Sequence, residues 1–380
     1  MDLSLNEQQK QLQDVARDFV RKEASKETLV AMDREGVTFS RELWEKAASL
    51  GWLGVAIPAE YGGEGMTLLD TAIIHEEMGR GPVPGPFFES AVLCAQIILA
   101  GGTEEQKKKL LPEIARGELI VALAALDSVQ RWGPRWVMME AVSRDGGYEL
   151  SGVKPFVQYA SVSDSFLVAA RTGGSTSADG ITLFIVDRST AGVEARDLTG
   201  RPIEGLISGL GELKLERVQI PASAVLGTVG AGWSYLEQAS YQSIPVLNSY
   251  KIGAMEALTE MSIDYSRTRV VFGQAIGRFQ RVQDRILDAV NHRDAARWTN
   301  YEAIWKLEQG REALSSVHMA KAVASEGYYI SSELTAAVFG GIGVEPGTGV
   351  NKHIKMSRRL YSHLGDPTYH RNKMVDALDI

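Results

Sequence analysis

Residues 265–280, YSRTRVVFGQAIGRFQ, lie between two long stretches of helical periodicity. Helical patterns of 13 residues or more recur through the C-terminal part of the chain, at about 233–269, 281–309, 311–339 and 351–363. Long helices that pack against one another are typical of a bundle. We therefore predict a C-terminal four-helix bundle over residues 232–380.

The rest of the chain divides by composition. Residues 1–118 contain shorter amphipathic helical patterns, which predict an all-α N-terminal domain. Between residues 119 and 231, short β-rich runs such as GITLFIVDR (180–188) alternate with Gly, Ser and Asp turns. We predict a β-barrel-like middle domain there.

Charge and hydropathy exclude several classes of function. The 380-residue chain has a net charge of −8 and no long Lys/Arg run, so a nucleic-acid partner is not expected. No stretch approaches eighteen apolar residues, and the first residues contain no apolar leader, so we predict neither a membrane span nor a secretory signal. A single cysteine, Cys94, excludes an intrachain disulfide. We expect a cytoplasmic protein and predict no metal site.

Five segments carry a family resemblance. They are LGWLGVAIPAEYGGEGM (50–66), GTEEQKKKLLPEIARGEL (102–119), VQIPASAVLGTVGAGW (218–233), the 265–280 segment and Gly340-Gly-Ile-Gly343. In this order and spacing the chain resembles the acyl-CoA dehydrogenase superfamily from end to end. Arg269 and Gly341 are 341 − 269 = 72 residues apart, which matches the family without a gap.

The resemblance implies both a cofactor and a reaction. FAD would oxidise an acyl-CoA thioester between its α and β carbons. A carboxylate removes the α-proton while hydride passes from the β-carbon to the flavin. Such a site needs a base whose pKa is raised by burial, and donors that stabilise the developing charge on the thioester oxygen.

Both family positions for this base lack a carboxylate. Counting 23 residues from Gly341 reaches Leu364, and counting 22 residues back from Tyr265 reaches Ser243. The nearest carboxylate is Asp366, in Gly-Asp-Pro, which either serves as a relocated base or closes a turn. In the family, the backbone N–H at the base position also donates to the thioester oxygen, and Leu364 retains that group.

Family members build each flavin site from two chains, and the two contributions differ here. On the side of the flavin ring, the Thr-Glu-Pro and Gly-Ser pattern is missing from residues 122–134, and the Trp-x-Thr position is Phe156-Val-Gln158. The elements that one chain lends to its neighbour largely remain, except for Ala337 where the family has Gln. They are Arg269, Phe272, Phe279, Gln280, Gly340 and Gly341.

Each of these residues also has an ordinary structural interpretation. Arg269 could form a surface salt bridge, while Phe272 and Phe279 could belong to the core. In their common motif, however, a guanidinium suits pyrophosphate oxygens, and adjacent glycines let a cofactor approach the backbone.

Three hypotheses follow from the asymmetry. The first is a subunit that lacks a base and completes the FAD site of a homologous, base-containing partner in a heterotetramer. Heteromers of this kind in the family often act on ring-containing acyl-CoAs such as steroid degradation intermediates, with an electron-transfer flavoprotein as a possible acceptor. The second is an active homotetramer with Asp366 as base, and the third is a flavin-free acyl-CoA-binding scaffold.

Overall fold

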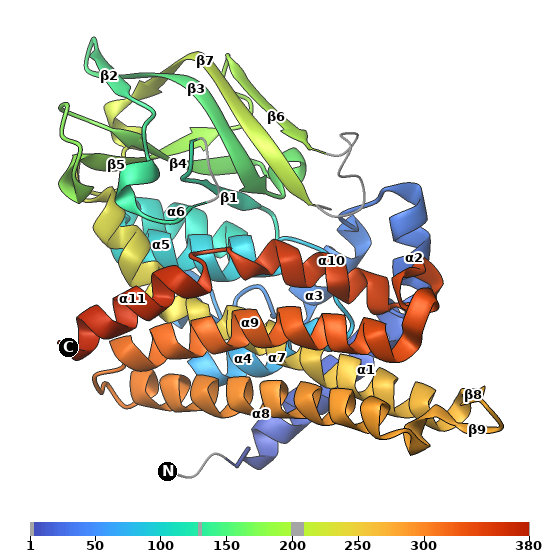
Figure 1. The fold of residues 1–380 in the computed structure, drawn as a ribbon. Coiled ribbons are helices and arrows are strands. Elements are labelled where there is room, and N and C mark those ends of the chain that lie inside the picture. Colours follow the sequence, from blue (N-terminus) through green and yellow to red (C-terminus); the bar gives the residue numbers. More distant parts are fainter. Residues whose placement is uncertain (1–3, 128–130, 199–208, 380) are drawn as a thin grey trace. The chain divides into compact units, whose positions relative to one another are not determined.

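The computed structural model of the chain describes residues 4–127, 131–198 and 209–379. Helices occupy the chain up to Ala115, strands occupy Val121–Pro221, and helices return from Gly232 (Figure 1). The predicted order of helical, β-rich and helical segments is confirmed. No helix among the described residues is long and apolar enough to cross a membrane.

Residue contacts divide the chain into two compact units. We call residues 38–67 and 84–243 the β unit, and residues 1–37, 68–83 and 244–380 the bundle unit.

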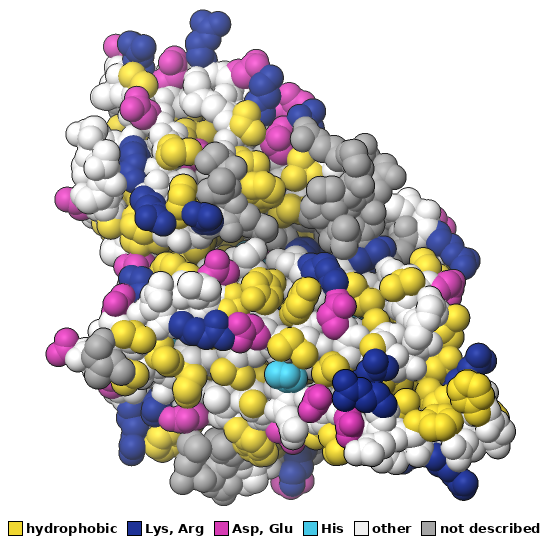
Figure 2. Space-filling model, in the orientation of Figure 1, with side chains coloured by type: hydrophobic (Ala, Val, Ile, Leu, Met, Phe, Trp, Pro, Cys, Tyr) yellow, Lys and Arg dark blue, Asp and Glu magenta, His cyan; other side chains and the backbone are white. Residues whose placement is uncertain are grey.

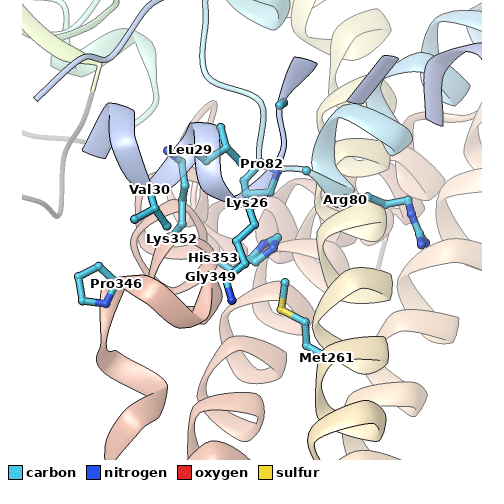
Figure 3. Close-up of a pocket in the computed structure, with 12 residues that line it drawn as sticks. Lys26, Leu29, Val30, Arg80, Pro82, Met261, Pro346, Gly349, Lys352 and His353 are labelled. Atoms are coloured by element: carbon cyan, nitrogen blue, oxygen red, sulfur yellow. The ribbon is translucent and has the colours of Figure 1, made fainter. Parts of the chain in front are cut away.

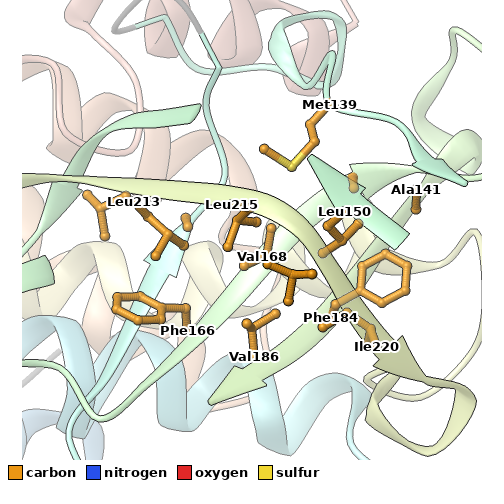
Figure 4. Packing of buried hydrophobic residues seen from close by; sticks show 14 of the residues in the cluster. Met139, Ala141, Leu150, Phe166, Val168, Phe184, Val186, Leu213, Leu215 and Ile220 are labelled. Atoms are coloured by element: carbon orange, nitrogen blue, oxygen red, sulfur yellow. The ribbon is translucent and has the colours of Figure 1, made fainter. Parts of the chain in front are cut away.

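Two sheets form the core of the β unit. Their strand orders are β1-β4-β5 and β2-β3-β7-β6. The strands are β1 (Val121–Ala124), β2 (Ala141–Arg144), β3 (Gly147–Gln158), β4 (Ser165–Arg171), β5 (Ile181–Asp187), β6 (Val193–Asp197) and β7 (Leu210–Pro221). Leu150, Phe166, Phe184 and Leu213 are fully buried in one hydrophobic cluster (Figure 4).

The helices of the β unit start and stop where local chemistry dictates. They are α3 (Arg41–Ser49), the π-helical turn η2 (Glu89–Cys94), α5 (Ala95–Gly101) and α6 (Glu104–Ala115). Gly51 follows α3 with φ +75°, a conformation that glycine adopts without strain. Thr103 and Gln106 form a capping box at the start of α6.

One ion pair is buried inside the β unit. Lys154 is fully buried on β3, and its Nζ lies 2.8 Å from Asp127 Oδ1. Burial lowers the pKa of Lys154 to about 8 although the Asp127 charge opposes this. Residues 128–130, which belong to the eroded flavin-ring motif, lie outside the described residues.

Long helices dominate the bundle unit. They are α7 (Gly232–Thr268, from Ile244 onward), α8 (Gln280–Glu308), α9 (Leu314–Phe339), α10 (Val350–Tyr361) and α11 (Pro367–Leu378), joined by α1 (Glu7–Glu23), α2 (Lys26–Glu35) and α4 (Leu68–Arg80). The α8 and α9 helices lie side by side along much of their length, and α10 and α11 also contact α9.

Two glycines allow α4 to approach α7 closely. A Cβ atom on Gly79 would lie 1.8 Å from the Tyr250 carbonyl oxygen, and one on Gly253 would lie 1.7 Å from that of Glu76. Side chains at these positions would force the two backbones apart, so the crossing depends on both glycines.

Candidate functional site

A two-residue hairpin follows α7. Its strands β8 (Val270–Val271) and β9 (Gln274–Ala275) are joined by Phe272 and Gly273, whose φ angles are +52° and +78°. Two consecutive positive φ angles are typical of a type I′ turn, and phenylalanine adopts one rarely. The Phe272 side chain is 92% exposed, so it is not a core residue. Figure 2 shows hydrophobic side chains gathered over this hairpin.

Arg269 joins α7 to the hairpin and presents an exposed guanidinium. Its backbone N–H donates to the Tyr265 carbonyl and its own carbonyl accepts from the Ile276 N–H, each at 2.9 Å. The side chain is exposed and forms no ion pair or hydrogen bond with any described residue. A surface salt bridge therefore does not explain Arg269.

The Gly-Gly turn ends α9. Gly340 has φ +68° and ψ −148°, a backbone conformation restricted to glycine. A Cβ atom on either Gly340 or Gly341 would meet no atom within 4 Å, so the backbone on this side is open. The Phe339 ring stacks on Tyr265 with centroids 4.2 Å apart, which ties the end of α9 to the end of α7.

The structure thus brings the predicted cofactor residues to one end of the bundle unit. Gln280 begins α8 and is exposed, and Phe279 packs edge-on against Phe272 with ring centroids 6.4 Å apart. Arg285 on the same helix donates to the Ala337 carbonyl at 3.0 Å. An exposed guanidinium, an exposed ring at Phe272 and an open glycine backbone fit the phosphate and nucleotide end of a cofactor such as FAD.

Leu364 lies in the loop of residues 362–366 between α10 and α11, which we call the base loop. Its side chain is buried and its φ is +57°. The Leu364 carbonyl accepts from His370 Nε2 at 2.9 Å, whereas its N–H has no acceptor among the described residues. An aliphatic side chain with no ionisable atom occupies this position.

Asp366, the candidate for a relocated base, and Ser243, at the family's second base position, have surroundings of different kinds. Asp366 caps α11, because its Oδ1 accepts from the Tyr369 N–H at 2.7 Å. Ser243 is fully buried on α7, and its hydroxyl has no partner among the described residues. Neither position places a free carboxylate in the described structure.

A buried amine pair beneath the base loop was missed by the sequence analysis. Lys321 Nζ lies 3.1 Å from Ser325 Oγ and 3.0 Å from the Gly365 carbonyl, and Lys251 Nζ lies 2.8 Å from the same hydroxyl. Burial lowers the pKa of Lys321 to about 7 and that of Lys251 well below its usual value. The signal was available, because Lys321 occupies an apolar helix face four residues after Val317.

Two histidines extend this buried group. His370 Nε2 faces the Leu364 carbonyl, and its Nδ1 lies 2.8 Å from His318 Nδ1. A carbonyl only accepts, so Nε2 of His370 carries the proton and its Nδ1 accepts from His318. Burial lowers the pKa of His318 to about 4, and burial beside Lys321 lowers that of His370, so both rings are neutral at pH 7.

A separate cavity of about 120 Å³ lies elsewhere in the bundle unit (Figure 3). Lys26, Arg80 and Lys352 contribute charged groups to a lining that is otherwise largely apolar. Cofactor pockets are usually about 300–1,000 Å³. This cavity is therefore too small for FAD or an acyl-CoA, and it contains none of the predicted site residues.

Comparison with known proteins decides the family. The chain matches models of the acyl-CoA dehydrogenase N-terminal domain over residues 6–118, the middle domain over 134–218 and the C-terminal domain over 230–378. It is 31% identical over 337 residues to L-prolyl-[peptidyl-carrier protein] dehydrogenase from Serratia sp. (strain ATCC 39006), with 86% of each chain covered. The chain belongs to the acyl-CoA dehydrogenase family.

Solved structures of other family members support both the fold and the cofactor. The FAD complex of PigA shares 25% identity with this acyl-CoA dehydrogenase homologue at a TM-score of 0.92, covering 100% of this chain and 99% of that one. A chain of the ChsE4–ChsE5 complex from Mycobacterium tuberculosis shares 26% identity at a TM-score of 0.87, with the same coverage. FAD, predicted from the sequence, is thus the cofactor found in a structure of this family, and the family's members are oxidoreductases.

Proposed function

We propose that this chain is a subunit of an FAD-dependent acyl-CoA dehydrogenase and completes the flavin site of a homologous, base-containing partner. The observation that carries the proposal is the contrast between two parts of the bundle unit. Arg269 is exposed and has no polar partner among the described residues, Phe272 is 92% exposed, and the backbone at Gly341 is open, whereas Leu364 occupies the base position with an inert side chain.

The exposed elements support a role toward another chain. Phe272 is 92% exposed, so a second surface that covers its ring would remove apolar area from water. The same surface, or a cofactor held by it, could supply an anion for the exposed guanidinium of Arg269. The ChsE4–ChsE5 complex is a precedent among similar structures for two different chains assembling together. The assembly we propose is a heterotetramer, working in the cytoplasm, with an electron-transfer flavoprotein as the acceptor.

In that assembly the chain's own residues bind and orient rather than move protons. Arg269 would hold phosphate oxygens, Gln280 would offer an amide, and Gly340-Gly341 would let the cofactor lie against the backbone. FAD would accept the hydride, and the partner's carboxylate would remove the α-proton of the acyl-CoA. Steroid-like or other ring-containing acyl groups remain the substrate class that we expect.

Flavin content tests this proposal. The chain is co-expressed with a base-containing homologue encoded beside it, and FAD per complex is measured by absorbance. Arg269→Ala should reduce bound FAD at least severalfold without dissociating the complex. Arg267→Ala is the matched control, because Arg267 is an exposed arginine in the last turn of α7.

A second measurement asks whether the chain is an active enzyme without any partner. A chain that purifies alone as a yellow homotetramer and is bleached by an acyl-CoA would contradict the proposal. If Asp366→Asn then abolished that bleaching, Asp366 would be a relocated base. An assembly that binds acyl-CoA but takes up no FAD, even with the partner present and FAD in excess, would instead support a flavin-free scaffold.

A further inference from the structure

Two consecutive carbonyls of the base loop are held from inside the bundle unit. The Leu364 carbonyl accepts from His370 on α11, and the Gly365 carbonyl accepts from Lys321 on α9. Both donors are buried, at 1% and 0% exposure. The loop is therefore fixed by side chains that come from two different helices.

Burial of the Lys321 amine is energetically unfavourable. This amine shares the Ser325 hydroxyl with Lys251, and no described carboxylate forms an ion pair with either lysine. Burying an ammonium without a partner is strongly unfavourable, and methionine would fill similar space without that penalty. The bond to the Gly365 carbonyl is a contribution that methionine could not make.

The backbone that these groups hold is strained and leaves one donor unused. Leu364 has φ +57°, which costs a residue with a side chain roughly 1–2 kcal/mol. Gly365 N–H donates to the Ser362 carbonyl, but the Leu364 N–H has no acceptor among the described residues. Leu364 is 2% exposed and buried backbone donors are nearly always paired, so this N–H is the group of the base loop that a ligand's carbonyl oxygen would use.

We propose that Lys321 and His370 are positioning residues that hold the base loop so that the Leu364 N–H can donate to the oxygen of a bound acyl thioester. The identity of this ligand rests on the proposed function. The chain would then keep the carbonyl-binding part of a thioester site while lacking the proton acceptor. It would bind and polarise a thioester without oxidising it.

Infrared difference spectroscopy with butyryl-CoA labelled with ¹³C at the carbonyl tests the proposal. The full-length chain without added flavin should bind the probe and move its carbonyl stretch to lower wavenumber. Lys321→Met should remove most of that shift and weaken binding about fivefold, the effect of one poorly formed hydrogen bond. Lys251→Met is the matched control, since Lys251 is equally buried and bonds Ser325 but not the loop.

Three outcomes would overturn the proposal. They are no binding by the wild-type chain, an unchanged carbonyl shift in Lys321→Met, and equal losses in the two lysine variants. His370→Phe removes the donor to the Leu364 carbonyl and should also remove most of the shift in the thioester carbonyl stretch. Flavin bleaching by the chain alone would contradict the proposed function but leave the carbonyl shift intact, so the two failures are distinguishable.

Discussion

Replacing Lys321 by methionine should stabilise the fold at acidic pH while weakening thioester binding. Burial lowers the pKa of Lys321 from 10.5 to about 7. At about 1.4 kcal/mol per pKa unit, the buried amine costs roughly 5 kcal/mol of unfolding free energy below pH 7. Methionine removes this cost but loses hydrogen bonds to Ser325 and Gly365, each about 1 kcal/mol. A net gain of about 3 kcal/mol is expected at pH 6.

The pH dependence gives this prediction its sign. Between about pH 7 and 10.5 the folded chain binds fewer protons at Lys321 than the unfolded chain, so stability rises with pH, by up to about 1.4 kcal/mol per pH unit. The groups that face the amine are Lys251 on α7, Asp366 in the loop, His370 on α11 and His318 on α9. The methionine variant lacks the Lys321 contribution, so its advantage should shrink by about 3 kcal/mol from pH 6 to pH 9.

Urea unfolding followed by tryptophan fluorescence at pH 6, 7, 8 and 9 measures this difference. Lys251→Met, compared in parallel, reports the contribution of the second amine. The reasoning is refuted if the stabilities of wild type and Lys321→Met run parallel across this range, or if the variant is the less stable protein at pH 6.

Three further changes test the fold and the loop. Asp127→Asn leaves the buried Lys154 without its anion and should lower the unfolding free energy by about 3–5 kcal/mol in urea titrations; a loss below 1 kcal/mol would argue against the ion pair. Gly253→Ala places a methyl group against the Glu76 carbonyl and should cost about 3 kcal/mol, seen as a clear fall in Tm; an unchanged Tm would contradict the close crossing. Asp366→Ala removes the α11 cap and should cost about 1 kcal/mol without altering flavin content in the complex, whereas lost flavin would assign Asp366 another role.

Helical periodicity predicted the long helices well because it reports which faces are buried. The pattern at about 311–339 corresponds to α9 (Leu314–Phe339), and that at about 281–309 corresponds to α8 (Gln280–Glu308). Local chemistry was less decisive. Both Ser4-x-x-Glu7 and Asn6-x-x-Gln9 fit the pattern of a capping box, and Asn6 and Gln9 form it, since asparagine caps a helix as well as serine does.

The site was predictable only in part. Motif spacing assigned Arg269 and Gly341 to the same group of cofactor-binding residues. In the structure, the stack of Tyr265 on Phe339 brings the two segments that carry them together. The exposure of Phe272 could not be deduced, because a phenylalanine is more often buried than left in solvent. The contacts of the Lys321 amine also depend on which helices meet, and sequence alone does not state that α9 passes beneath the base loop.

The central claim is that this chain cannot remove an α-proton by itself, since Leu364 replaces the base. The most direct measurement mixes the purified chain, reconstituted with FAD, with butyryl-CoA under anaerobic conditions and follows flavin absorbance near 450 nm. We expect the flavin to remain oxidised with this chain alone and to bleach once the base-containing partner is present. Bleaching by the chain alone would contradict the account.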